Sequence, residues 1–254
     1  LMFLSLMLLL LMGYPVAFTS GAIALVFGII FLGVDFFTLL PLRIWGILTN
    51  FTLLAVPLFI FMGVILDRSG IAEDLLETMG KLFGKLNGGL AISVVIVGAM
   101  LAATTGVVGA TVVTMGIIAL PIMLKHNYSA SLASGTIAAS GTLGQIIPPS
   151  IILILLGDVM GVPVGRLFVG SIIPGLLLVT FFMLYILIYA WHKPSVAPAF
   201  NLKQNNFNYI DLINTILPPL LLILSVLGSI FLGIATPTES AAVGAIGALI
   251  LAVC

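Results

Sequence analysis

Several long stretches of this chain carry no charged side chain at all, among them residues 1–33 and residues 89–124. About 20 apolar residues in a helix suffice to cross the ~30 Å hydrocarbon core of a bilayer, so both stretches are long enough to enter a membrane. Only 6% of the residues are charged and 62% are hydrophobic, whereas soluble domains carry about 25% charged residues. We therefore expect an all-α polytopic protein that lies in the lipid bilayer.

The same composition argues against several functional classes. Eight basic and eight acidic residues cancel, so no net charge points to a nucleic acid. The single cysteine, Cys254, excludes a disulfide framework or a cysteine metal cluster. The apolar stretches contain no paired carboxylates, HExxH or GxSxG motif, so we expect no enzyme. His126 and His192 each adjoin a lysine between apolar runs and are interpreted as loop residues.

Short polar segments divide the first part of the chain. The "GYP" at 13–15 predicts a break between two helices, residues 34–49 are predicted as a connection, and residues 50–66 as a further span. Residues 71–86 differ, because apolar side chains recur there at helical spacing opposite a charged face. Glu77 and Lys81 stand at i,i+4. We expect this segment to lie along the membrane surface.

Residues 89–124 are interrupted by "AATTGVVGAT". The interruption leaves arms of roughly 15 and 14 residues, each short of the ~20 residues of a full crossing. A re-entrant hairpin with its tip near Thr104–Gly109 fits these lengths. The alternative is a pair of short tilted spans joined by a threonine- and glycine-rich turn.

The next helix, residues 129–157, is broken by "GTLGQIIPPS" at 141–150. Unwound backbone at membrane depth is tolerated only where it faces protein or a water-filled cavity. It exposes carbonyl oxygens suited to a small hard cation and N–H groups suited to a carboxylate. The two breaks could meet and form a binding site, although the prolines could also produce a mere kink. The side-chain oxygens available there belong to Thr104, Thr105, Thr111, Ser140, Thr142, Gln145 and Ser150.

The remaining segments are predicted as a span at 167–190, a polar cytoplasmic loop at 191–209 and a span at 210–232. A last helix, 236–254, begins with a capping box in "TPTE". "YPVAFTSGAIAL" (14–25) and "TPTESAAVGAIGAL" (236–249) share a proline followed by Gly-Ala-Ile, and they run in opposite directions in this topology, which is typical of an inverted repeat. All five lysines fall on one side of the membrane in this topology, which the positive-inside rule predicts to be cytoplasmic; they are Lys81, Lys85, Lys125, Lys193 and Lys203.

Five motifs together resemble one family. "AATTGVVGATVVTMG" and "ASGTLGQIIPPSIILILLGD" are similar to the large membrane subunit of TRAP transporters, the DctM-like family. So are "MGYPVAF", "LAVPLFIFMGVIL" and "GIATPTESAAVGAIGALIL". The resemblance runs along nearly the whole chain.

The resemblance implies an inverted-repeat ion-transporter fold of the elevator type. Its parts would be scaffold helices (1–70), an interfacial arm helix (71–88), a transport region (89–190) and the scaffold of a second repeat (210–254). It implies a multi-pass protein of the bacterial inner membrane that imports an organic acid with a sodium gradient. The implied partners are a small four-helix membrane subunit and a periplasmic solute-binding protein.

Carried over by position, the resemblance implies that backbone and hydroxyl oxygens hold the coupling Na⁺ at Thr104, Thr105, Gly106, Gly141, Thr142, Leu143, Gly144 and Pro148. We expect contacts with the solute from Thr111, Ser140, Gln145 and Ser150. The tip reads "TTGV" where many members have "SGSS", which leaves open which of Thr104 and Thr105 is the ligand. This version of the tip resembles a branch associated with mannitol or chloroaromatic compounds, but a carboxylate solute is favoured.

The second hairpin and second broken helix of the family have no counterpart in these residues. We therefore expect a fragment that does not transport alone. Three alternatives remain: a stand-alone Na⁺- or H⁺-coupled anion carrier of the same fold, an intramembrane enzyme and a purely structural membrane partner.

Overall fold

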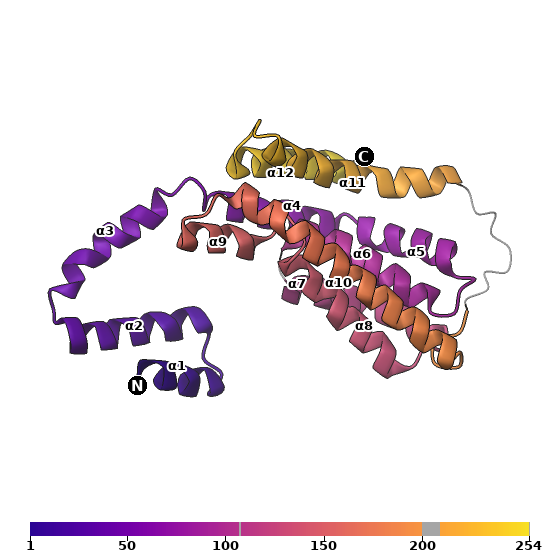
Figure 1. Ribbon diagram of the computed structural model, residues 1–254, viewed down its shortest axis with the longest axis horizontal. Helices are drawn as coiled ribbons and strands as arrows, with labels where there is room; N and C mark the ends of the chain where they lie inside the picture. Colours follow the sequence, from indigo (N-terminus) through magenta and orange to yellow (C-terminus); the bar gives the residue numbers. More distant parts are fainter. Residues whose placement is uncertain (107, 200–208, 254) are drawn as a thin grey trace. The chain divides into compact units, whose positions relative to one another are not determined.

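The computed structural model describes residues 1–106, 108–199 and 209–253, and all regular secondary structure in these ranges is helical (Figure 1). The chain divides into two compact units, Leu1–Asn50 and Phe51–Cys254.

The first unit consists of α1 (Met2–Leu11), α2 (Val16–Leu32) and α3 (Phe36–Leu48). The break predicted at "GYP" is present: Gly13 adopts the left-handed conformation with φ +85°, and Pro15 is the N-cap of α2. Residues 34–49, predicted as a connection, contain a helix that was not predicted. Apolar side chains dominate these residues, and the chain forms α3 despite Arg43 and a proline, Pro41, inside the helix.

The second unit begins with a bent pair of helices, α4 (Ala55–Arg68) and α5 (Ile71–Phe83), whose axes differ by 60°. Gly70 permits the bend, because its φ of +83° is strained for any other residue. The buried face of α5, which includes Leu75, Leu76 and Met79, packs on α6, and Glu77 pairs with Lys81 as the spacing predicts. That α5 lies along the membrane surface stays a prediction.

The interrupted apolar stretch forms α6 (Gly89–Thr105) and α7 (Val108–Lys125), separated at Gly106 with φ +59°. The two helices form a hairpin. Tyr128, just after α7, is buried, and its hydroxyl accepts a hydrogen bond of 3.2 Å from the Leu90 N–H at the start of α6. Helices of 17 and 18 residues exceed the predicted arm lengths, so length no longer separates a re-entrant hairpin from two crossings.

The broken helix consists of α8 (Ala130–Thr142), a short 3-10 turn η1 (Leu143–Gln145) and α9 (Ile151–Met160). Ser129 is the N-cap of α8, and its hydroxyl oxygen accepts from the Leu132 N–H. The interruption therefore lies where "GTLGQIIPPS" predicts it. α10 (Val164–His192) follows and is longer than predicted at both ends.

The last two helices are α11 (Tyr209–Phe231) and α12 (Pro237–Val253). The capping box is confirmed: the Thr236 N–H donates to Glu239 Oε2 at 2.7 Å, and the Glu239 N–H donates to Thr236 Oγ1 at 3.3 Å. α12 packs along α4, and Thr238 Oγ1 donates to the Phe51 carbonyl O at 2.6 Å. Part of the predicted loop, residues 200–208 with Lys203, lies outside the described residues.

Hydrogen bonds hold the lysine-bearing ends of several helices of the second unit close together. The Gly88 N–H donates to the Ala197 carbonyl at 2.9 Å, and the Ser129 N–H donates to the Val196 carbonyl at 3.0 Å. The start of α6, the end of α7, the start of α8 and the end of α10 therefore meet. Lys125 and Lys193 thus belong to one end of the unit, as the sequence predicts.

Three described helices are long and apolar enough to cross a membrane: α7, α10 and the Leu212–Phe231 part of α11. The bent α4–α5 pair would be a fourth if it forms one span. The chain is a multi-pass helical membrane protein.

Candidate functional site

The two interruptions of the second unit meet. η1 packs against α6, and a Cβ placed on Gly144 would lie 2.6 Å from the Ala102 carbonyl O. On the other side of the hairpin, a Cβ on Gly141 would overlap the Val112 side chain of α7. Both glycines thus let the broken helix approach the backbone of the hairpin more closely than any other residue would.

The tip of the hairpin also reaches the second half of the broken helix. A Cβ on Gly106 would lie 3.3 Å from the Ile151 backbone N and 3.1 Å from Ile151 Cγ1. Ile151 is the first residue of α9, so the tip stands beside the N-terminus of that helix.

Four helix ends therefore converge at this point. α6 and the α8–η1 segment end here and present carbonyl oxygens, which carry partial negative charge. α7 and α9 begin here and present N–H groups, which carry partial positive charge. The arrangement offers oxygen ligands to a cation and N–H donors to an anion without any ionised side chain.

Three predicted hydroxyls are buried at this junction: Thr104, Ser140 and Ser150. Each donates to a backbone carbonyl, Thr104 Oγ1 to Leu101 O at 2.7 Å, Ser140 Oγ to Ile137 O at 2.9 Å and Ser150 Oγ to Gln145 O at 2.8 Å. A hydroxyl that donates its hydrogen in this way keeps its oxygen lone pairs for another partner. These oxygens can therefore accept from a donor or bind a cation.

The other predicted residues are placed differently. Thr111 is buried, whereas Thr142 and Gln145 are exposed, and Thr142 Oγ1 donates to the Ala139 carbonyl at 2.7 Å. Leu143 and Pro148 are buried in the broken helix. The Thr105 side chain and Val107 lie outside the described part of the chain. Which of these residues bind an ion or solute stays a prediction.

The sequence reasoning missed the partner of the broken helix on α6. A Cβ on Gly98 would lie 2.6 Å from Ser140 Cβ, just as Gly144 abuts Ala102. Gly98 and Ala102 stand four apart on α6, and Ser140 and Gly144 stand four apart on the facing segment. Small residues at this spacing allow close helix packing in membranes, and this pattern could have identified the contact.

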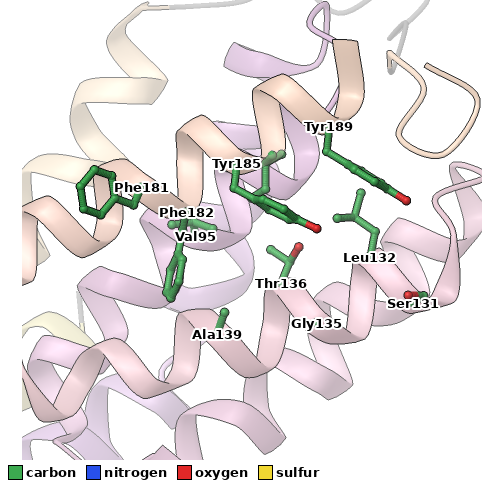
Figure 2. A pocket seen from close by; sticks show the side chains of 11 residues that line it. Val95, Ser131, Leu132, Gly135, Thr136, Ala139, Phe181, Phe182, Tyr185 and Tyr189 are labelled. Atoms are coloured by element: carbon green, nitrogen blue, oxygen red, sulfur yellow. The ribbon is translucent and has the colours of Figure 1, made fainter. Parts of the chain in front are cut away.

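A cavity of about 480 Å³ lies beside the first half of α8 (Figure 2). Phe182, Tyr185 and Tyr189 extend toward it from α10, and Ser131 and Thr136 line it from α8. None of the predicted site residues lines this cavity. It is separate from the junction of the two breaks.

Comparison with known proteins decides the family. Residues 3–254 match the family model described as the tripartite ATP-independent periplasmic transporter, DctM component. The chain belongs to the DctM family. The hairpin tip and the broken helix are therefore features of a DctM-family sequence.

Curated relatives of the DctM chain have different solutes in their names. The C4-dicarboxylate TRAP transporter large permease protein DctM of Vibrio cholerae is 37% identical over 206 residues, 80% of this chain and 44% of that protein. The ectoine permease TeaC of Halomonas elongata is 32% identical over 244 residues, 96% of this chain and 56% of that protein. The isethionate permease DctMQ of Oleidesulfovibrio alaskensis is 31% identical over 203 residues, 80% of this chain and 32% of that protein. The chain spans about half the length of the curated relatives it matches, and less of DctMQ.

Proposed function

We propose that this chain is part of the membrane permease of a sodium-coupled, binding-protein-dependent importer of an organic acid. The observation that carries the proposal is the contact between Gly144 of the broken helix and Ala102 of the hairpin, which brings two carbonyl-bearing helix ends together. Family membership adds the class of transporter.

The proposed Na⁺ site uses neutral oxygens. Within residues 1–106, 108–199 and 209–253, no group of three or more His, Cys, Asp or Glu could hold a metal ion. The candidate ligands are backbone carbonyls near Thr104–Gly106 and Gly141–Pro148, with the buried Thr104 hydroxyl beside them. Oxygen ligands of this kind suit a hard cation.

The proposed solute site uses the opposite helix ends. The N-termini of α7 and α9 favour a carboxylate or another anionic group, and Gln145 is exposed beside them. We propose that the buried side chains of Ser140, Ser150 and Thr111 form the inner wall of this site. A second, inverted half with its own hairpin would complete the site, and the two halves would form an elevator.

The proposed assembly has two further components, a small membrane subunit and a periplasmic solute-binding protein, in a bacterial inner membrane. One relative is named as a DctMQ permease. The solute is proposed to be a small organic acid or zwitterion, since the names of the relatives include C4-dicarboxylate, ectoine and isethionate.

Uptake into proteoliposomes tests this proposal. The complete permease, its small subunit and its binding protein are supplied with labelled C4-dicarboxylate, ectoine and isethionate. Uptake of one solute is expected with an inward sodium gradient and not with an equal potassium gradient. Equal uptake under potassium would remove sodium from the mechanism, and uptake without the binding protein would indicate a stand-alone carrier.

A pair of variants ties the sodium dependence to the junction. Thr104→Val removes a buried hydroxyl at the hairpin tip, and the sodium concentration for half-maximal uptake should rise roughly tenfold, which is about 1.4 kcal/mol. Thr180→Val on α10 removes an exposed hydroxyl with a similar backbone hydrogen bond, to Leu176 O, and should leave that concentration unchanged.

A further inference from the structure

Asp67 is an acidic side chain that the proposed mechanism does not use. It lies in the last turn of α4, next to the fully buried Leu66, and is itself partly buried. Its Oδ2 accepts a hydrogen bond of 2.8 Å from Thr114 Oγ1 of α7. Its Oδ1 is buried and has no hydrogen-bond partner among the described residues.

Asp67 lies in the last turn of α4, and the Thr114 that it contacts lies well inside the apolar length of α7. At ~1.5 Å per residue, Asp67 is about 18 Å along α4 from Ala55, and Thr114 is about 16 Å along α7 from Lys125. α7 is one of the helices long and apolar enough to span a membrane. An ionisable group at such a position is expensive to keep and commonly marks an ion or proton pathway.

No basic side chain in the described ranges forms an ion pair with Asp67. Arg68 follows it directly but is exposed. α6 carries no charged residue. The other helices packed on α4, and α7, carry the following charged residues: Glu73, Asp74, Glu77 and Lys81 of α5, Asp158 of α9, Glu239 of α12 and Lys125 of α7. Among them, Lys81 forms an ion pair with Glu77.

A carboxylate oxygen that is buried without a hydrogen-bond partner is unfavourable unless a positive charge neutralises it. We propose that Asp67 binds a small monovalent cation, a proton or Na⁺, at Oδ1 between α4 and α7. Thr114 holds the carboxylate by donating to Oδ2, and its own oxygen lone pairs remain available to the same cation.

The position of the site gives it a role that rests on the proposed function. α4 belongs to the proposed scaffold and α7 to the proposed transport region. A cation at Asp67 therefore favours one arrangement of these two parts, and its release accompanies their separation. The site is distinct from the junction at Gly106 and Gly144.

Infrared difference spectroscopy of the complete purified permease in lipid nanodiscs tests binding without requiring transport. A bound proton gives a carboxylic acid C=O band that disappears as the pH is raised, and bound Na⁺ gives a sodium-dependent shift of the carboxylate bands. Asp67→Asn should abolish whichever signal is present, because the amide keeps the size and an acceptor oxygen for Thr114 but cannot bind either cation as a carboxylate does. Asp74→Asn removes an exposed acid on α5 and should leave the signal intact.

Thr114→Val provides the second variant and should weaken the cation affinity about tenfold while the Asp67 signal persists. If Asp67→Asn fails to fold, the lower cation affinity of Thr114→Val tests the proposal by itself. Identical spectra for the wild type, Asp67→Asn and Thr114→Val would overturn the inference. Uptake that proves independent of sodium while the Asp67 signal persists would refute the proposed function and leave the binding site standing.

Discussion

Gly144 is a residue whose lack of a side chain allows the broken helix to pack closely against the hairpin. A methyl group there would press on the Ala102 carbonyl at 2.6 Å, and that backbone is held inside α6. Overpacking of this kind costs about 1–3 kcal/mol. We predict that Gly144→Ala lowers the thermal stability of the purified permease and reduces sodium-driven uptake.

Gly135 offers the matched control on the same broken helix. A Cβ there meets nothing within 4 Å. Replacing a glycine inside a helix by alanine stabilises by about 0.5–1 kcal/mol, so Gly135→Ala should match or exceed the wild type in a thermal unfolding assay. Equal stability of Gly144→Ala and Gly135→Ala would contradict the close approach of η1 to α6.

The sequence identified the residues of the breaks but not what surrounds them. Glycines and prolines predict an interruption within Gly141–Pro148 because backbone preferences are local, although Gly141 and Thr142 still belong to α8. That Gly141 and Gly144 are also packing contacts depends on α7 and α6, which lie far along the chain. Asp67 was passed over for the same reason, since at the end of an apolar run it reads as a solvated terminus until Thr114 is placed beside it.

Tyr128 links the two ends of the α6–α7 hairpin. Its hydroxyl accepts from the Leu90 N–H across 38 residues of sequence, and burial raises the pKa of Tyr128, so the phenol stays neutral. Tyr128→Phe leaves a buried N–H unpaired, which costs about 1–3 kcal/mol. We predict faster hydrogen exchange at the base of α6, measured by mass spectrometry on peptides covering residues 89–93.

Tyr14→Phe is the control for this change, because Tyr14 is exposed in the first unit. It should leave exchange in α6 at the wild-type rate. Unchanged exchange in Tyr128→Phe would mean that the hairpin is held by its packing alone.

At the level of elements, the sequence predicted the breaks better than the lengths. Gly13, Gly106 and the 141–150 segment interrupt helices where expected, because the interrupting residues act locally. The arms of the hairpin extend further than predicted, since threonine and valine near the tip are accommodated in helix once it packs on α8. The sequence predicted a connection at 34–49 but not the helix α3 within it, because Pro41 and Arg43 interrupt its apolar residues.

The orientation of the whole molecule in the membrane can be tested at the lysine-bearing end of the second unit. The bonds from Gly88 and Ser129 to Ala197 and Val196 bring four helix ends together at the lysine-bearing end. The positive-inside rule predicts that this end is cytoplasmic. In a permease freed of all its cysteines, including Cys254, we predict that Lys125→Cys and Lys193→Cys are labelled by a membrane-impermeant thiol reagent only from the inside, and Val159→Cys only from the outside.

Labelling at the tip of the hairpin distinguishes a re-entrant hairpin from two full crossings, which the helix lengths do not. Gly109 lies at the start of α7, and a Cβ there meets nothing within 4 Å, so Gly109→Cys is tolerated. If α6 and α7 are full crossings, this cysteine emerges outside and is labelled as fast as Val159→Cys. If they form a re-entrant hairpin, it stops inside the membrane, and labelling is slow from both faces and slows further with sodium. The inverted-repeat proposal requires the second result, since its first hairpin must end at the same depth as the break in α8–α9.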